Sequence, residues 1–196
     1  VRTWTAGGDG VTWTQASNWS GNAVPTSTDA VYIPSGATPQ ITTGTQTVAE
    51  FASDAAVTIT GGTLNLTQPA IMQSVTLNGG TLDGVGTIRT IGGIDWSSGT
   101  ITGSGALKTY GTSNVGSTST LTLSRNWTNL GSINFSSTGS GGDLSISSGT
   151  TLTNRGNFGL AATVSGADII GAGTFSNAGY LAKSSGTVNN AISSSS

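Results

Sequence analysis

From about residue 38 onward, apolar and polar positions alternate along the chain in short runs of four to six residues. Strict alternation predicts β-strands with one buried face, and the glycines between the runs predict tight bends. No window shows apolar residues at helical spacing over three turns, so we expect an all-β protein. Typical runs are AVTIT (56–60), GTLNLT (62–67), SVTLN (74–78), STLTLS (119–124) and DLSISS (143–148).

The runs also repeat. GGTLDGVGTI (79–88) returns as SSGTITGSGAL (97–107), and an earlier copy, GGTLNL, occupies 61–66, so Thr63, Thr81 and Thr100 hold the same place in the phrase. Toward the C-terminus the repeated phrase changes to TNLGSI (128–133), TNRGNF (153–158) and SNAGYL (176–181). A period of about 18–25 residues with two or three short strands is typical of one coil of a β-solenoid, whose thin apolar ring is buried only when coils stack.

We therefore predict a parallel β-helix over residues 36–196, right-handed because parallel strands joined by same-sense crossovers wind that way. Leu82 and Ile88 should fill the interior, Thr81 and Thr87 should face outward, and Gly80, Gly84 and Gly86 should turn the corners. The alternative is a β-sandwich, in which turn signals also recur at short, regular intervals.

Residues 1–35 differ from the rest and form a Trp-rich N-terminal cap followed by a first strand. They contain Trp4, Trp13 and Trp19, three of the five tryptophans. The favoured interpretation is that these side chains cover the open end of the first coil and block edge-to-edge pairing. The alternative is a sugar-binding platform, since aromatic faces stack on pyranose rings and Asp9 or Asp29 would bind hydroxyls.

The composition restricts the function. Zero Cys excludes disulfides and thiolate chemistry, and zero His removes the commonest metal ligand and general base. Six scattered basic residues give no nucleic-acid footprint, and the apolar runs are too short to span a membrane. No signal peptide is seen at Val1, so we expect a mature form or a fragment. Low Lys and Glu with abundant Ser, Thr, Asn and Gly favours a secreted, extracellular protein.

The eight carboxylates give little indication of catalysis, and we predict no enzyme, no cofactor and no metal site. Polysaccharide-cleaving β-helices need two or three carboxylates on one face. Only Asp83 and Asp95, with Arg89 between them, lie within one coil, and solvated outward positions are the favoured interpretation.

Threonine pairs suggest an ice-binding alternative, because two hydroxyls leave one strand face in each pair. The pairs are Thr58 with Thr60, Thr100 with Thr102, Thr120 with Thr122 and Thr151 with Thr153. Their spacings do not share one period, so ordinary strand surface is preferred.

Asparagines have two expected roles. Four sequons would carry N-glycans in a host that makes them, at Asn18, Asn65, Asn126 and Asn134. The recurrent Asn129, Asn154 and Asn177 should lie at coil corners, where amides bond to neighbouring turns and asparagine tolerates left-handed backbone.

The opening stretch WTAGGDGVTWTQASNWSGNAVPTSTDAVYI resembles the start of many large bacterial surface and autotransporter-type adhesins. The resemblance is carried by Trp4, Gly7, Gly8, Trp13, Asn18, Trp19, Pro25, Asp29, Val31 and Ile33. The later GGTLxGxGTI and TxxGxF phrases resemble the haemagglutinin-like β-helix repeats of the same proteins. The resemblance implies a cell-surface stalk, adhesin or filament and carries no catalytic residue with it.

The leading hypothesis is thus an extracellular structural protein: a β-solenoid subunit or segment of a stalk, fibre or adhesin. We expect it to self-associate end to end as a homo-oligomer or filament, with host or surface glycans as further partners and neither nucleic acid nor a membrane span. The alternatives are a carbohydrate-binding, less readily a carbohydrate-cleaving, β-helix and an ice-binding β-solenoid.

Overall fold

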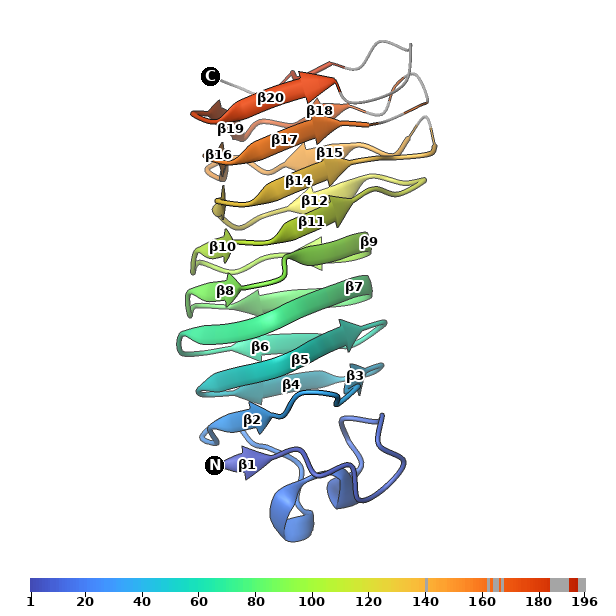
Figure 1. Cartoon of the computed structure of the whole chain (residues 1–196), viewed down its shortest axis with the longest axis vertical. Coiled ribbons are helices and arrows are strands. Elements are labelled where there is room, and N and C mark those ends of the chain that lie inside the picture. Colours follow the sequence, from blue (N-terminus) through green and yellow to red (C-terminus); the bar gives the residue numbers. More distant parts are fainter. Residues whose placement is uncertain (140, 162, 164–165, 167, 184–190, 194–196) are drawn as a thin grey trace.

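The computed structural model describes residues 1–196 except 140, 162, 164–165, 167, 184–190 and 194–196. Its strands stack in parallel as a β-solenoid of about seven turns, with the N-terminus at one end of the rod (Figure 1). Every pairing between its named strands is parallel. The predicted parallel β-helix is confirmed. The β-sandwich alternative is wrong, because a sandwich is built from antiparallel sheets.

The strands form three faces, which we name A, B and C. Face A contains β1 (Arg2–Thr3), β2 (Val31–Ile33), the starts of β5 (Phe51–Ile59) and β7 (Ala70–Gly84), β8 (Ile88–Thr90), β10 (Leu107–Thr109), β13 (Trp127–Asn129), β16 (Thr151–Asn154) and β19 (Thr174–Asn177). Face B contains β3 (Gln40–Ile41), the end of β5, the middle of β7, the start of β9 (Ile94–Ile101), β11 (Thr112–Val115), β14 (Ser132–Phe135), β17 (Asn157–Leu160) and β20 (Tyr180–Lys183). Face C contains β4 (Thr45–Val48), β6 (Thr63–Leu66), the ends of β7 and β9, β12 (Leu121–Leu123), β15 (Leu144–Ile146) and β18 (Ile169–Ile170).

The coil is right-handed. In Figure 1 the strands nearest the viewer, such as β11, β14 and β17, run to the right while the chain climbs from the N-terminus. The strands behind them run back to the left, which is the sense of a right-handed helix. This agrees with the hand expected for parallel crossovers.

The register between turns follows the sequence repeat. Thr81 pairs with Thr100 and Leu82 with Ile101, as the alignment of the repeated phrases predicts, and Thr63 of the earlier copy pairs with Thr81. Further along, Asn129 pairs with Asn154, which in turn pairs with Asn177. Loops of different length lie between strands that keep the same register, so the turns differ in length without disturbing the stack.

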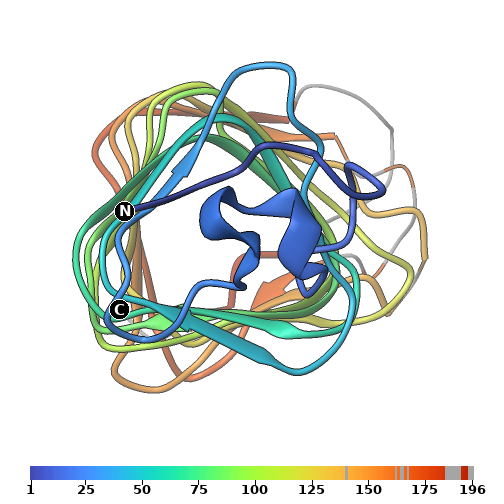
Figure 2. The same cartoon turned by 90° about the horizontal axis from the view of Figure 1, so that it is seen from below.

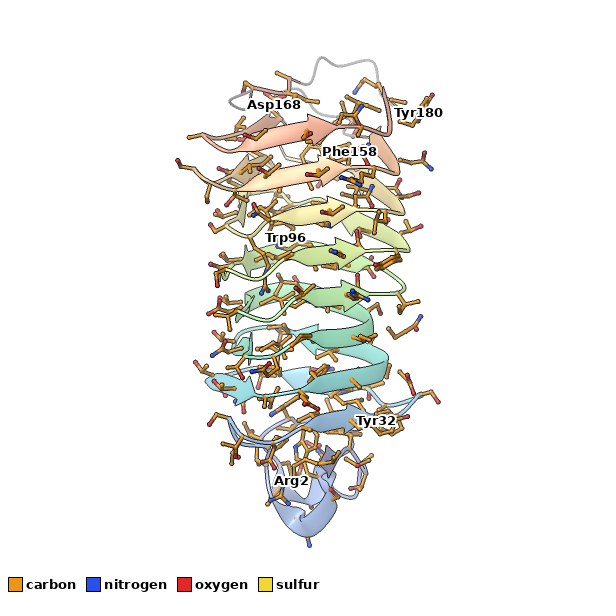
Figure 3. All side chains as sticks on the ribbon, turned by 90° about the vertical axis from the view of Figure 1, so that its left-hand side faces the viewer. Arg2, Tyr32, Trp96, Phe158, Asp168 and Tyr180 are labelled. Carbon is orange, nitrogen blue, oxygen red and sulfur yellow. The ribbon has the colours of Figure 1, made fainter. Side chains whose placement is uncertain are left out.

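Inward apolar columns make up the core. Leu82 and Ile88 are fully buried, whereas Thr81 and Thr87 are only partly covered, as predicted. Two of the largest buried side chains, Trp96 and Trp127, fill the middle turns with ring centroids 6.5 Å apart. The aromatic ring of Phe158 continues the core inside the coil, whereas Tyr32 and Tyr180 project from the flank (Figure 3).

Glycine is required at the corner before face C. Gly80 and Gly99 stack on consecutive turns with φ of 63° and 86°, a region that side chains with a Cβ rarely adopt. A methyl group on Gly80 would also collide with the carbonyl oxygen of Gly62 below it. Corners are therefore fixed by backbone-to-backbone contact between turns.

The two helical elements are three-residue 3₁₀ turns, η1 (Ala16–Asn18) and η2 (Ser20–Asn22), which lie across the end of the coil in Figure 2. In the part of the chain that the structure describes, no helix has the length and apolar character needed to cross a membrane.

Candidate functional site

The three N-terminal tryptophans form one buried cluster. Trp4 and Trp19 meet edge to face with centroids 4.9 Å apart, and Trp13 meets Trp19 at 4.7 Å. Trp13 also stacks on Phe51 of the following turn at 6.1 Å. Each tryptophan is at most 2% exposed. The rings therefore cover the end of the coil, and the sugar-platform alternative does not fit, because no ring face reaches solvent.

Asn18 is the centre of the cap's hydrogen bonding. Its side chain is fully buried, and Oδ1 accepts the backbone N–H groups of Gly8 and Gly10 at 3.0 Å each. Nδ2 donates to Asp9 Oδ1 at 2.7 Å and to the carbonyl oxygen of Thr12 at 2.9 Å. The sequence marks Asn18 as a sequon. Both hydrogens of its side-chain amide are engaged in hydrogen bonds, so attaching a glycan to this nitrogen would break one of them.

Asp9 is held ionised by the same loop. Its carboxylate accepts hydrogen bonds from the Thr12 hydroxyl, from Asn18 and from the backbone N–H groups of Val11 and Thr12. These bonds, the one from the Thr12 hydroxyl first, hold the pKa of Asp9 well below its usual range, because they stabilise the charged form. The geometry of the cap loop thus depends on a charged carboxylate.

The other three sequons lie on outward positions. Asn126 and Asn134 are exposed, and Asn65 is partly covered. Asn65 donates to Thr47 Oγ1 at 3.3 Å, Asn126 accepts the N–H of Thr151 at 2.8 Å, and Asn134 donates to Asn114 Oδ1 at 3.2 Å. All three side chains bridge neighbouring turns, and their glycosylation stays a prediction.

The acidic residues that sequence reasoning placed within one coil do not converge. Asp83 lies on face C, Arg89 on face A and Asp95 on face B. Asp143 and Asp168 do lie on adjacent turns, where Asp143 Oδ1 accepts the backbone N–H of Asp168 at 2.9 Å. Among the described residues, no three acidic side chains gather in a group that would hold a metal ion. This arrangement favours structural roles for the carboxylates over acid–base chemistry.

Asn129, Asn154 and Asn177 form an inward asparagine ladder at the end of face A. Asn129 Nδ2 donates to Asn154 Oδ1 at 2.8 Å, and Asn154 Nδ2 donates to Asn177 Oδ1 at 2.6 Å. Asn154 Nδ2 also donates to the carbonyl oxygen of Tyr180 at 3.0 Å. The predicted bonds between turns are confirmed. None of the three asparagines uses the left-handed backbone that this residue type tolerates: among the described residues, Ala6 and Asn22 are the non-glycine residues with positive φ.

Arg125 is a buried cation that sequence reasoning did not single out. Its side chain is 1% exposed, and its guanidinium donates to the carbonyl oxygens of Gly84, Gly86 and Gly105 on earlier turns. Burial lowers its pKa to about 10, opposed by the charge of Asp83. A single basic residue in a hydroxyl-rich run does not indicate burial in the sequence. Its position is explained by the carbonyl oxygens of the stacked glycine corners, which accept its hydrogen bonds.

A shallow apolar depression of about 490 Å³ lies over the first turns of face A, lined by Tyr32, Phe51 and Ile71 among others. Tyr32 donates its hydroxyl hydrogen to Asp54 Oδ2 at 2.7 Å, which raises the pKa of Tyr32 because the bond holds its proton. Glu50 also lines the depression, which is open to solvent. It is a surface hollow rather than an enclosed ligand pocket.

The threonine pairs predicted from the sequence do not form a common array. Thr58 lies on face B, Thr100 and Thr122 on face C, and Thr153 on face A. The register does, however, stack Thr100 directly against Thr122, and both belong to a longer outward column of face C. We call it the hydroxyl column: Thr45, Thr63, Thr81, Thr100, Thr122 and Ser145.

The chain matches no protein-family model, no curated protein and no solved structure.

Proposed function

We propose that this protein is a structural segment of an extracellular stalk, fibre or adhesin, in which the coil serves as a stiff spacer. The observation that carries the proposal is the continuity of bonding between turns. Inward columns are buried along the rod up to its last described turn, and polar side chains such as those of the asparagine ladder bond from one turn to the next. Such a stack resists bending because each turn is fixed to its neighbours.

The distribution of reactive groups supports a non-enzymatic role. Asp83, Arg89 and Asp95 project from three different faces, so they have no common substrate position. General acid and base groups must both lie within reach of one bond to act on it.

Self-association end to end is part of the proposal. On the last described turn, Leu181 is 37% exposed, whereas Phe158, its partner in the same inward column, is fully buried. The neighbouring Tyr180 is 67% exposed. Covering this surface with another coil would bury apolar side chains at about 25 cal/mol per Å².

Glycans on a host or another cell are the adhesive partner that we propose. Since the tryptophans are buried, a glycan would contact the outward Thr and Asn columns rather than aromatic rings. A glycan array with the intact chain measures this directly.

Electron microscopy at increasing protein concentration tests the structural role. Because the tryptophan cap covers the other end, we expect stiff rods that join in pairs through the end carrying Leu181 as concentration rises. Leu181→Lys should abolish this increase in length, while Ile71→Lys, on the flank of face A, should not. Compact particles that are not rods would contradict the proposed role as a stalk. Rods of constant length at every concentration would contradict end-to-end association.

A further inference from the structure

Six consecutive turns place a hydroxyl at the same outward position of face C. Strand pairing aligns Thr45 with Thr63, Thr63 with Thr81, Thr81 with Thr100, Thr100 with Thr122 and Thr122 with Ser145. The longest comparable run on face A is three residues, Thr128, Thr153 and Ser176. At the spacing of neighbouring strands, about 4.8 Å, the hydroxyl column extends for roughly 24 Å along the rod.

The hydroxyl groups of this column are free. In the described part of the chain, none of the six makes a side-chain hydrogen bond within the protein, although each residue is only partly covered or exposed. The outward column of face B behaves differently: Asn114 donates to Asp95 Oδ1 at 2.7 Å, and Asn134 donates to Asn114. The polar side chains in this column of face B therefore hydrogen-bond to one another, whereas the hydroxyl groups of the hydroxyl column on face C are left as unused donors and acceptors.

A second outward column runs beside the first, two residues along each strand. Its members are small and polar: Thr47, Asn65, Asp83, Thr102, Ser124 and Ser147. Some of them bond to one another, as the hydroxyls of Ser124 and Ser147 do. The two columns are separated by about 6.6 Å, two residues of a parallel strand. Face C thus forms a two-dimensional array of short side chains, with no aromatic ring among its twelve members and one charge, that of Asp83.

The array is rigid because the alternate residues of its strands pack into the core of the coil. On five of the six strands the residue between the two columns is fully buried, whereas Gln46 on the first is only partly covered; the five are Leu64, Leu82, Ile101, Leu123 and Ile146. The corner before the array is fixed by Gly80 and Gly99, which stack on each other. Threonine is also stiff at χ1, so little side-chain entropy is lost when a partner binds.

We propose that face C is an ice-binding surface, whose ligand is crystalline water. An array of hydroxyls with a repeat near the strand spacing is close to the oxygen repeat of ice, and each threonine also offers a methyl group for the gaps in the lattice. Water held in register on the array joins the crystal with little further ordering cost. A sugar polymer would be expected to use aromatic stacking, which the array lacks. This inference is independent of the proposed structural role.

The test compares two outward positions of strand β7. Thr81 lies in the middle of the hydroxyl column on face C, and Thr76 lies on face B of the same strand, with a similar degree of cover. The intact chain should show a gap between the melting and freezing temperatures of ice. Thr81→Tyr should abolish most of that gap because the ring breaks the plane of the array, and Thr76→Tyr should keep it.

Circular dichroism and thermal unfolding verify that both variants are folded. If the tyrosine ring prevents folding, Thr81→Val replaces Thr81→Tyr, because valine keeps the shape of the side chain and removes the hydroxyl. Absence of both thermal hysteresis and inhibition of ice recrystallisation in the intact chain would overturn the proposal. Equal losses in the face B and face C variants would overturn it too, as would retention on insoluble polysaccharide without any effect on ice.

Discussion

The asparagine ladder and the hydroxyl column are built by the same repetition and differ in where their side chains point. In the ladder, Asn129 and Asn154 are buried, and each amide donates to the asparagine of the next turn, ending at Asn177, which is exposed on the last rung. In the column, the hydroxyls face outward and, within the described part of the chain, have no protein partner. The difference indicates that repeated polar residues stabilise the rod where they pair with one another and leave a binding surface where they do not.

Breaking the ladder should have the largest effect on stability. Asn154 is fully buried, donates to Asn177 Oδ1 and the carbonyl oxygen of Tyr180, and accepts from Asn129. Asn154→Ala should lower the free energy of unfolding by about 3 kcal/mol, since it leaves buried polar groups unpaired. Chemical denaturation measures the loss. Asn157→Ala, at an exposed position on the next strand, should be nearly neutral; equal losses would show that the ladder is not a stabilising element.

Acid should destabilise the N-terminal cap before the asparagine ladder and the hydroxyl column, because neither the ladder nor the hydroxyl column contains a titratable group. The folded-state pKa of Asp9 is depressed, so its contribution to stability is present above the unfolded-state pKa of about 3.9 and is lost as the pH falls toward the folded value. Below pH of about 4 we expect the near-ultraviolet signal of the cap tryptophans to weaken before the β-sheet signal does. Asp9→Asn should weaken this pH dependence and leave the part due to Asp29, whose pKa is also lowered, by the hydrogen bonds from Thr26. An unchanged acid transition in the Asp9→Asn variant would contradict the assignment.

Removing one hydroxyl from the column should have the smallest effect on stability. Thr100→Val keeps the shape of the side chain on face C, so the free energy of unfolding should change by less than about 0.5 kcal/mol. The thermal hysteresis should nevertheless fall. The matched control is Thr58→Val on face B, which should change neither quantity. If Thr100→Val lowers the stability of the protein and leaves its thermal hysteresis unchanged, the hydroxyl column stabilises the rod and does not bind ice.

Much of the fold follows from the sequence because alternation and glycine spacing are local signals. The pairs Thr81–Thr100 and Leu82–Ile101 and the asparagine recurrence were all predicted from short repeated phrases. The burial of Trp4, Trp13 and Trp19 follows from their place at the end of a solenoid.

The hydroxyl column was predicted only in part: the repeated phrases align Thr63, Thr81 and Thr100, but the continuation to Thr122 and Ser145 was missed because the sequence spacing becomes irregular there. The interval between successive members changes along the rod, since the loops differ in length from turn to turn while the strand register stays fixed. The threonine pairs that the sequence singles out lie on three different faces. The role of Asn18 was also missed, because its contacts with Gly8, Gly10 and Asp9 depend on a loop that has no repeat.

The most direct measurement of the central claim, that the outward hydroxyl column carries a binding function, is incorporation into a growing ice crystal. A single crystal is grown in a dilute solution of the fluorescently labelled chain, with labelled Thr81→Tyr in a parallel experiment. We expect the intact chain to be retained in the ice on defined crystal planes and the Thr81→Tyr variant to be excluded into the liquid. Exclusion of both proteins, or retention of both on the same planes, would contradict the claim.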